Sequence, residues 1–219
     1  GQNISHLNWG TSAAKTVTLS FWIRSNKTGN TQVGFMNSAN DRAYVATFTI
    51  DTADTWEKKE LTVAGDTSGT WLDTNGIGLR LRWGSFGSTY QTSSVNQWVG
   101  SNGISRNDSP INFFDSTDNE LYLTGVQLEL GEQATPFEHR SFADELYRCK
   151  RYFQKSFNYD TAPENGDATG ISYNGGILGY CGSNNNGTLS GFHRFDPEMR
   201  ATPSITTYGN NSGHWGRVI

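Results

Sequence analysis

Apolar and polar residues alternate most clearly between residues 121 and 130, LYLTGVQLEL. A period of two residues predicts a half-buried strand, because successive side chains of a strand point to opposite faces. We expect Val126, Leu128 and Leu130 to face a hydrophobic core, and Gln127 and Glu129 to point outward or into a groove. Counted from Tyr122, one face carries Tyr122, Thr124, Val126, Leu128 and Leu130, and the other carries Leu123, Gly125, Gln127 and Glu129.

A helix is predicted to begin shortly after this strand. Ser141 is followed three residues later by Asp144, a capping-box-like pattern that satisfies the amides of a first helical turn. Asp144 and Arg148 are spaced for a favourable i,i+4 pair worth about 0.3 kcal/mol. Apolar residues then recur on one helical face, at Phe142, Leu146, Cys149 and Phe153.

Similar strand patterns precede this region, about every ten residues, with turns rich in Gly, Asn, Asp and Ser between them. In the segment 16–25 the pattern predicts a core face and a polar face that carries Trp22 and Arg24. The segment 56–64 is polar along much of its length, which is typical of a sheet edge. The expected strands are 4–9, 16–25, 32–37, 43–50, 56–64 and 78–83, with long polar loops at 84–96 and 100–112.

The fold class that this spacing favours is all-β, a jelly-roll β-sandwich followed by one short helix and a smaller β-region. We expect three parts: a first domain at 1–137, a connecting helix at 138–155 and a C-terminal β-region at 156–219. Candidate strands in the last part are 171–181, 188–195 and 204–208. The chain starts at Gly1 and stops within an apparent strand pattern, so we expect further sequence or neighbouring chains to complete this region.

Composition supports a β-rich protein and excludes some function classes. The 219 residues include 13% aromatics, 17% charged residues and 25 glycines, the profile of a chain with many turns. A net charge of −4 without a basic stripe argues against nucleic-acid binding. No apolar run reaches the roughly 20 residues of a membrane-spanning helix. For Cys149 and Cys181, two buried thiols in a reducing compartment and a bridge between helix and C-terminal region stay open.

The run LYLTGVQLELGEQATPFEHRSFADELYRCKRYFQ closely resembles a segment of tailed-phage structural proteins, especially tail-fibre-like proteins of marine and environmental phages. The resemblance extends through TLSFWIRS, TIDTADTWEKKELTVAGDTSGTW and GLRLRW on one side and RFDPEMRATPSITTYG on the other. It covers most of the chain. It implies a virion protein with a carbohydrate-binding-module-like jelly roll joined to a C-terminal region.

One position departs from that family pattern. Related jelly rolls often carry a pair of Asp residues in the last strand beside a structural calcium ion. Thr124 and Gly125 stand at the matching positions here. Neither supplies a carboxylate, and calcium needs several hard oxygen ligands. No cofactor is expected, and a structural calcium stays open.

The resemblance also implies a sugar-binding groove on the face opposite the core. An aromatic plate suits the apolar face of a pyranose, and planar polar side chains suit its hydroxyls. The alternative is that Trp22 packs under a loop and that the charges pair with one another. The candidate residues for this groove are Trp22, Arg24, Arg80, Arg82, Gln127 and Glu129.

Other residues with chemical potential are weaker candidates. Trp71 and Trp98 border polar loops and form a second rank of ligand-binding residues. The alternative for both, and the expectation for Trp56 and Trp83 as well, is a core residue or loop anchor. The four histidines have no zinc-site spacing, and no G-x-S-x-G or H-E-x-x-H pattern is present. We expect neither a metal site nor catalytic residues.

Three functions follow from these observations. The first is a non-enzymatic phage tail fibre or appendage that recognises host-surface glycans, as a homotrimer assembled with other virion proteins. The second is a purely structural capsid-decoration or fibre-assembly module without sugar binding. The third is a depolymerase with an unrecognised carboxylate pair. In the first two cases the expected location is the virion, assembled in the host cytoplasm, without nucleic-acid binding or membrane insertion.

Overall fold

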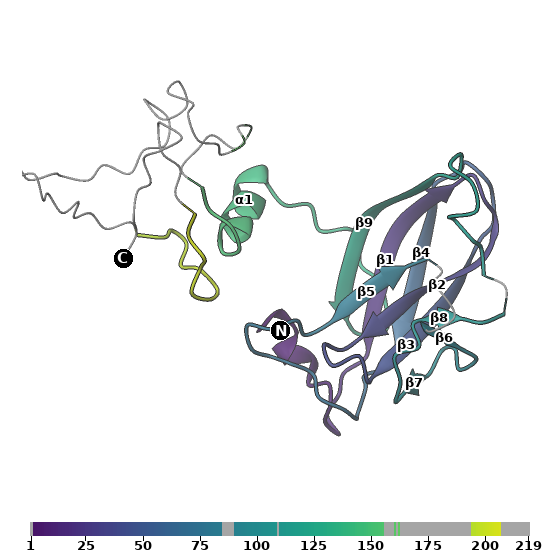
Figure 1. Cartoon of the computed structure of the whole chain (residues 1–219), viewed down its shortest axis with the longest axis horizontal. Helices are drawn as coiled ribbons and strands as arrows, with labels where there is room; N and C mark the ends of the chain where they lie inside the picture. Colours follow the sequence, from purple (N-terminus) through teal and green to yellow (C-terminus); the bar gives the residue numbers. More distant parts are fainter. Residues whose placement is uncertain are drawn as a thin grey trace, which may run out of the picture. The chain divides into compact units, whose positions relative to one another are not determined.

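In the computed structural model of Figure 1, the described part of the chain is all-β, built mostly of antiparallel sheets, with one short α-helix. The structure describes residues 2–84, 90–108, 110–155, 160, 162 and 194–206. The chain divides into two compact units, Gly1–Glu138 and His139–Ile219. The strand expected at 171–181 lies outside the described residues, as do residues 188–193 of the strand expected at 188–195 and residues 207–208 of the strand expected at 204–208. Residues 194–195 and 204–206 are described and form no strand.

Two antiparallel sheets form the body of the first unit. One sheet has three strands in the order β4-β1-β9, and the other has four in the order β5-β2-β3-β7. A parallel pair, β6 and β8, forms a third, small sheet. The strands are β1 (Val17–Ser25), β2 (Gly29–Met36), β3 (Ala43–Ile50), β4 (Glu57–Val63), β5 (Arg80–Trp83), β6 (Gln91–Thr92), β7 (Trp98–Val99), β8 (Ser105–Arg106) and β9 (Leu121–Leu130).

The two main sheets share one hydrophobic core and lie face to face (Figure 1). The core face of β1 is the predicted one: Leu19, Phe21 and Ile23 are almost fully buried. From the opposite sheet, Phe35 and Tyr44 complete the cluster. Because strands of both sheets alternate along the chain, this core cannot form before residues far apart in sequence meet.

Several strand predictions are confirmed. The expected strand 43–50 coincides with β3, and β1 begins one residue later than expected. The polar segment 57–63 is an edge strand, β4, as its charges predicted. The strand expected at 4–9 is wrong: Gln2–Leu7 is a 3-10 helix, η1. A six-residue segment with a few apolar positions can be either a short strand or a short helical turn with one buried side. Here Leu7 is buried although its segment belongs to no sheet.

The polar stretch between β5 and β9 is more than a loop. Part of it packs on the outer face of the four-stranded sheet, where Ile104 joins Met36 and Ala43 in a second small core. A Cβ added to Gly34 would lie 2.7 Å from the carbonyl oxygen of Ile104. Gln32, also fully buried on this face, donates a hydrogen bond to Ser105 Oγ at 3.2 Å. The outer face of the four-stranded sheet is therefore partly buried as well.

A β-bulge interrupts β9 at its middle. Gln127 pairs with Ser20 and Thr124 pairs with Trp22, so Gly125 and Val126 together oppose the single residue between Ser20 and Trp22. Gly125 has φ +59°, the left-handed conformation that glycine adopts without steric cost. The extra residue shifts the face on which each following side chain lies.

The bulge makes the predicted alternation wrong in the first half of the strand. Tyr122 and Thr124 lie opposite the outward residues of β1, on the face that carries Gln127 and Glu129. Val126, expected in the core, is 41% exposed. In the second half, Leu128 packs against the core as predicted, whereas Leu130, also expected in the core, is 44% exposed.

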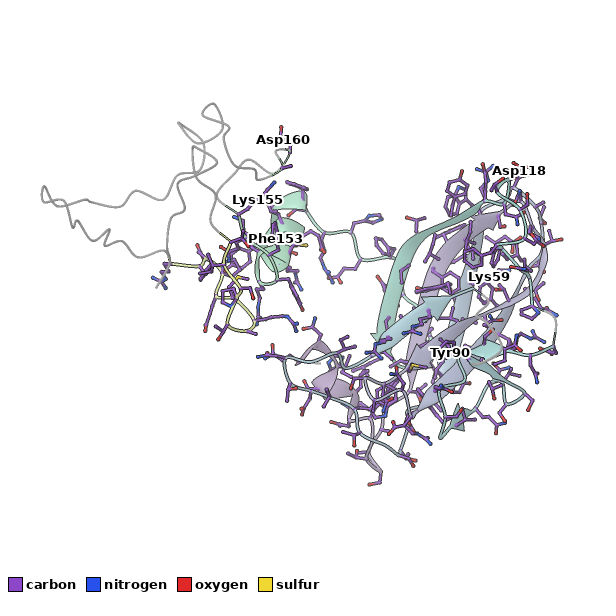
Figure 2. All side chains as sticks on the ribbon, viewed as in Figure 1. Lys59, Tyr90, Asp118, Phe153, Lys155 and Asp160 are labelled. Atoms are coloured by element: carbon purple, nitrogen blue, oxygen red, sulfur yellow. The ribbon has the colours of Figure 1, made fainter. Side chains whose placement is uncertain are left out.

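The second unit contains α1 (Phe142–Lys150), which begins where the sequence predicted. The Ser141 hydroxyl accepts a hydrogen bond from the Asp144 amide at 3.2 Å, and Asp144 pairs with Arg148 at 3.3 Å. No residue of α1 is buried, and Phe142 is 81% exposed. Cys149 is an exposed free thiol, so its predicted burial is wrong; Cys181 lies outside the described residues. Figure 2 shows Phe153, also exposed, just beyond the helix.

Replacing Gly125 by alanine tests the bulge. Alanine is strained at φ +59°, and its Cβ would lie 3.1 Å from Trp22 Cδ1. We expect Gly125→Ala to lower the free energy of unfolding by about 1–2 kcal/mol in urea denaturation. Gly100→Ala is the control, since its added Cβ meets only a flexible arginine at 3.7 Å, and it should cost less than about 0.5 kcal/mol. Equal effects of the two changes would contradict this role of Gly125.

Candidate ligand-binding face

The outer face of the three-stranded sheet is a regular grid set by strand register. Trp22 of β1 lies between Lys58 of β4 and Thr124 of β9. One step along, Arg24 pairs with Tyr122, and Trp56 immediately precedes β4. In the other direction, Ser20 lies between Glu60 and Gln127, and Thr18 lies between Thr62 and Glu129.

Residues 131–138, which we call the strap, return across the Thr18 end of this grid. Thr18 Oγ1 donates to the carbonyl oxygen of Gly131 at 2.8 Å, and Thr62 Oγ1 donates to that of Glu132 at 3.3 Å. These two bonds turn the chain back over the sheet as soon as β9 ends. Thr18, although it points away from the core, is therefore buried.

Gln127 holds the far end of the strap. Its Nε2 donates to Thr135 Oγ1 at 3.3 Å and to the carbonyl oxygen of Pro136 at 3.4 Å. Its Oε1 accepts from the amide of Glu138 at 2.8 Å. Both donor hydrogens and one acceptor lone pair of the amide are thus used within the chain. A ligand would have to displace the strap to reach this side chain.

Glu129 holds the middle of the strap. Its carboxylate accepts from the Thr135 amide at 3.1 Å and from the Thr135 hydroxyl. These bonds, first that of the Thr135 hydroxyl and then that of Gln127, hold the pKa of Glu129 below its ordinary value. The structure therefore assigns Gln127 and Glu129 to anchoring the strap, and the expectation that they line an open groove is not met.

The strap leaves the other end of the grid open. Trp22, Trp56 and Tyr122 are each between 41% and 44% exposed there, and we call these three residues the aromatic platform. The Trp56 and Tyr122 rings lie 6.4 Å apart at 55°. Gly125 lets the Trp22 ring lie close against β9, because an added Cβ at this position would lie only 3.1 Å from Trp22 Cδ1. Phe137, at the end of the strap, is also half exposed.

Charged groups border the platform. The Arg24 guanidinium lies 5.6 Å from the centre of the Tyr122 ring, a cation–π distance. Arg24 Nε donates to the carbonyl oxygen of Asp54 at 2.9 Å, and its Nη2 lies 3.4 Å from the Asp54 carboxylate. Lys58 pairs with Glu60 at 2.7 Å. Aromatic rings and a fixed guanidinium thus share one exposed surface, while most of its charge is locally compensated.

Arg80 and Arg82 do not lie on this face. They pair with Met36 and Gly34, so they point outward from the four-stranded sheet, across the core from Trp22. Arg80 Nη1 donates to Asn40 Oδ1 at 2.6 Å and to two backbone carbonyls. The alternation in the sequence correctly predicted that both arginines point away from the core. The two sheets have separate outer faces, however, and the arginines lie on a different one from Trp22. The expected single groove containing all six residues is therefore wrong.

The second-rank candidates Trp71 and Trp98 are structural. Both rings pack edge-on against Trp9, with centroids 4.7 and 5.2 Å from it, and against each other at 5.3 Å. Trp98 Nε1 donates to the carbonyl oxygen of Ala64 at 2.7 Å, and Trp71 Nε1 donates to Asp66. Sequence reasoning did not single out Trp9, whose place in this cluster depends on contacts distant in sequence.

Asp66 fixes the loop beneath that cluster. Its buried carboxylate accepts two hydrogen bonds from Arg42, at 2.8 and 2.6 Å, and one from the Ser68 amide. This bidentate bond to Asp66 raises the pKa of Arg42. The pair anchors the loop that carries Trp71.

Trp56, expected to be a core residue or loop anchor, is half exposed and belongs to the platform. A sequence signal for this existed: Trp56 lies one residue before the polar edge strand, in the register that matches Arg24. That signal becomes readable only when the partner strands are known.

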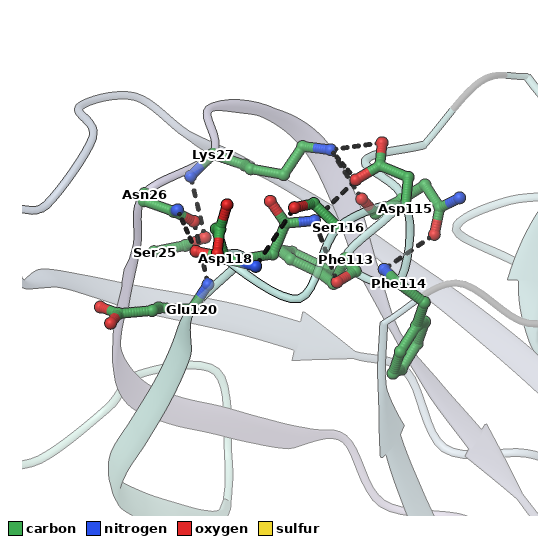
Figure 3. A network of polar contacts seen from close by, with 11 residues as sticks. Ser25, Asn26, Lys27, Phe113, Phe114, Asp115, Ser116, Asp118 and Glu120 are labelled. Carbon is green, nitrogen blue, oxygen red and sulfur yellow. Dashed lines mark hydrogen bonds and ion pairs between the residues drawn. The ribbon is translucent and has the colours of Figure 1, made fainter.

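The loops at the Ser25 end of β1 are closed by a polar network (Figure 3). Lys27 Nζ donates to both Asp115 carboxylate oxygens and to the carbonyl oxygen of Asn112, at 2.7–2.8 Å. Asn26 accepts from the Glu120 amide at 3.0 Å and donates to the carbonyl oxygen of Asp118 at 2.8 Å. These bonds tie the β1–β2 turn to the segment that leads into β9.

At the two positions where related jelly rolls carry an Asp pair beside calcium, this chain has no carboxylate. Thr124 faces outward beside Trp22, and Gly125 forms the bulge. Among residues 2–155 and 194–206, where described, no three His, Cys, Asp or Glu side chains lie close enough to hold a metal ion.

No protein-family model, curated protein or solved structure matches this chain. Within the described part of the chain, no helix has the length and apolar character needed to cross a membrane. By its geometry, the first unit is an all-β module with an exposed aromatic platform. The strap bounds one edge of this platform.

Acid should loosen the strap. Because the pKa of Glu129 is lowered in the folded protein, its contribution to holding the strap is complete above the ordinary value of 4.5 and is lost as pH falls through the lowered pKa. We expect amide hydrogen exchange of residues 132–138 to quicken, relative to the core strands, between neutral pH and about pH 3. Glu129→Gln is the control and should remove this pH step. A step that persists in Glu129→Gln would show that another group controls the strap.

The tryptophan cluster should depend on Asp66. Asp66→Ala leaves the partly buried Arg42 guanidinium without its partner, so we expect a loss of about 3 kcal/mol in the free energy of unfolding. Lys58→Ala removes an exposed ion pair with Glu60 and should change stability by less than about 0.5 kcal/mol. Both variants can be compared by guanidinium denaturation followed through tryptophan fluorescence. Similar small effects would mean that the buried pair is not a stability determinant.

Proposed function

We propose that this chain is a virion protein of a tailed phage, a tail fibre or appendage, whose first unit is a lectin-like jelly roll that binds host-surface glycans. The single observation that carries the glycan proposal is the aromatic platform on the outer face of the three-stranded sheet. The phage assignment rests on the sequence resemblance described above. The jelly roll is supported by a chain path that alternates between two antiparallel sheets: β1 and β4 lie in one, β2, β3 and β5 in the other, and β9 in the first.

The chemistry of the platform suits a sugar. The faces of pyranose rings are apolar and pack on aromatic rings, while their hydroxyls accept and donate hydrogen bonds at the rim. Trp22, Trp56 and Tyr122 supply such rings half exposed, and Arg24 stands beside them with its orientation set by Asp54. Because the platform is built on strands and a bulge, binding costs little ordering of the protein.

Single platforms of this kind bind sugars weakly, so several copies per particle are part of the proposal. The proposed homotrimer would raise apparent affinity by about 10²–10⁴-fold through multivalency. The exposed apolar side chains of α1 and the segment after it, including Phe142 and Phe153, are consistent with association in the assembled virion. The proposed location is the virion, with other virion proteins as neighbours.

Two alternatives are kept for stated reasons. A purely structural decoration or fibre-assembly module would use the same exposed aromatic residues to contact protein. A depolymerase would need two opposed carboxylates beside the platform, and Asp54 and Glu60 are instead each paired with a cation. We therefore propose binding without catalysis.

Alanine substitutions of the platform test the proposal. We expect Trp22→Ala and Tyr122→Ala each to weaken glycan binding at least about tenfold, or ~1.4 kcal/mol, because each removes a stacking surface. Measurements are a glycan array and adsorption of particles to host cells. Arg82→Ala is the matched control, since it lies on the other sheet and should leave binding unchanged.

Other outcomes separate the alternatives. Unchanged binding in both platform variants would remove this site from the proposal. A position of the chain on the capsid shell, located in intact particles, together with an empty glycan array, would favour the structural module. Release of oligosaccharide from host polysaccharide would favour the depolymerase.

A further inference from the structure

The two edge strands of the three-stranded sheet are protected very differently. β4 carries four consecutive charged residues, Glu57 to Glu60, and Lys59 is further paired with Asp51 at 2.8 Å and Glu57 at 2.6 Å. Such charges prevent a second strand from adding to an edge. β9, the other edge, is ten residues long and has one charged residue, Glu129.

Apolar side chains are exposed along β9. Leu121, Leu123 and Leu130 are between 38% and 44% exposed, and Val126 is 41% exposed. The four-stranded sheet shields only Leu128, which packs against the core. A long, apolar edge with a single charged residue is unusual for a strand that ends a sheet in solution.

The main chain of β9 is also directed outward. The amide of Gly131 donates to the carbonyl oxygen of Thr16 at 3.0 Å, which continues the register of β1 and β9. In an antiparallel ladder, hydrogen-bonded and non-bonded pairs alternate. The amides and carbonyls of Glu129 and Gln127 therefore point toward β1, and those of Leu128 and Leu130 point toward the open edge.

The side chains of β9 are arranged symmetrically about the bulge. If two copies pair antiparallel around a two-fold axis between Gly125 and Val126, Leu121 faces the second copy's Leu130, and Leu123 faces its Leu128. In an unbulged strand these partners would lie on opposite faces of the sheet. Because the bulge reverses the alternation, both pairs lie on the same face, and the bulges of the two copies come into register.

The outward-facing partners are compatible as well. The same pairing places Tyr122 opposite Glu129 and Thr124 opposite Gln127, so no like charges meet. An isologous contact of this kind requires each surface to complement itself, and β9 meets that requirement in its apolar, polar and main-chain groups.

We propose that β9 is an interface with a second copy of this chain, in which two three-stranded sheets join into one continuous sheet. This pairing would set two aromatic platforms on the same face of the joined sheet. It does not depend on what the platform binds, and a chain without any glycan ligand would still associate in this way.

Light scattering of the full chain during size-exclusion chromatography tests the proposal. The mass per chain is 24.2 kDa. We expect the wild-type assembly to contain twice as many chains as that of the variant Leu121→Glu/Leu130→Glu, because in this variant carboxylates oppose each other across the axis. The variant Leu121→Glu/Leu130→Lys puts opposite charges across the same axis and should restore the mass. Ile77→Glu, a change at a half-exposed residue outside β9, is the control and should leave the mass unchanged.

Hydrogen exchange separates loss of pairing from loss of folding. The amides of residues 128 and 130 should be protected in the wild type and exposed in Leu121→Glu/Leu130→Glu, while those of β1 stay protected in both. A mass that Leu121→Glu/Leu130→Glu does not halve would overturn the proposal. So would a Leu121→Glu/Leu130→Lys variant that folds but stays dissociated.

Discussion

The structure of the first unit depends on one extra residue in β9. Because Gly125 takes a left-handed backbone conformation, Tyr122 is turned to the face that carries Trp22, while Leu123 joins the opposite face. The same glycine leaves room for the Trp22 ring. Without this bulge, Tyr122 would face the core side of the sheet, and Trp56 would lose its neighbouring ring. Both the aromatic platform and the symmetry of β9 follow from that local change of register.

The strap decides which part of the outer face can meet a ligand. Gln127 and Glu129 are chemically suited to bind sugar hydroxyls, but their hydrogen-bonding capacity is directed at residues 135–138 of the same chain. Internal partners compete favourably because they are covalently close, so little entropy is lost in bringing them together. Such a strap narrows the exposed surface to aromatic rings and one guanidinium, and it connects the sheet directly to the segment that leads into α1.

Opposite edges of one sheet show two solutions to the same physical problem. Unpaired main-chain groups attract further strands, and β4 prevents this with charge, whereas β9 presents leucines. This difference is expected if β4 must remain an unpaired edge while β9 pairs with a second copy of the chain. For a proposed virion protein this arrangement has a consequence for binding, since weak sites become effective when several act together.

Local patterns by themselves determined much of this protein: the core face of β1, the limits of β3, the edge character of β4 and the cap of α1 at Ser141 are all readable from neighbouring residues. The Trp9 cluster, the separation of Arg80 and Arg82 from Trp22, the bulge and the use of Gln127 were decided only by tertiary structure. Alternation reports that a side chain avoids the core, but it does not report which sheet the strand joins. A single glycine can reverse that alternation, and only the partner strand reveals the reversal.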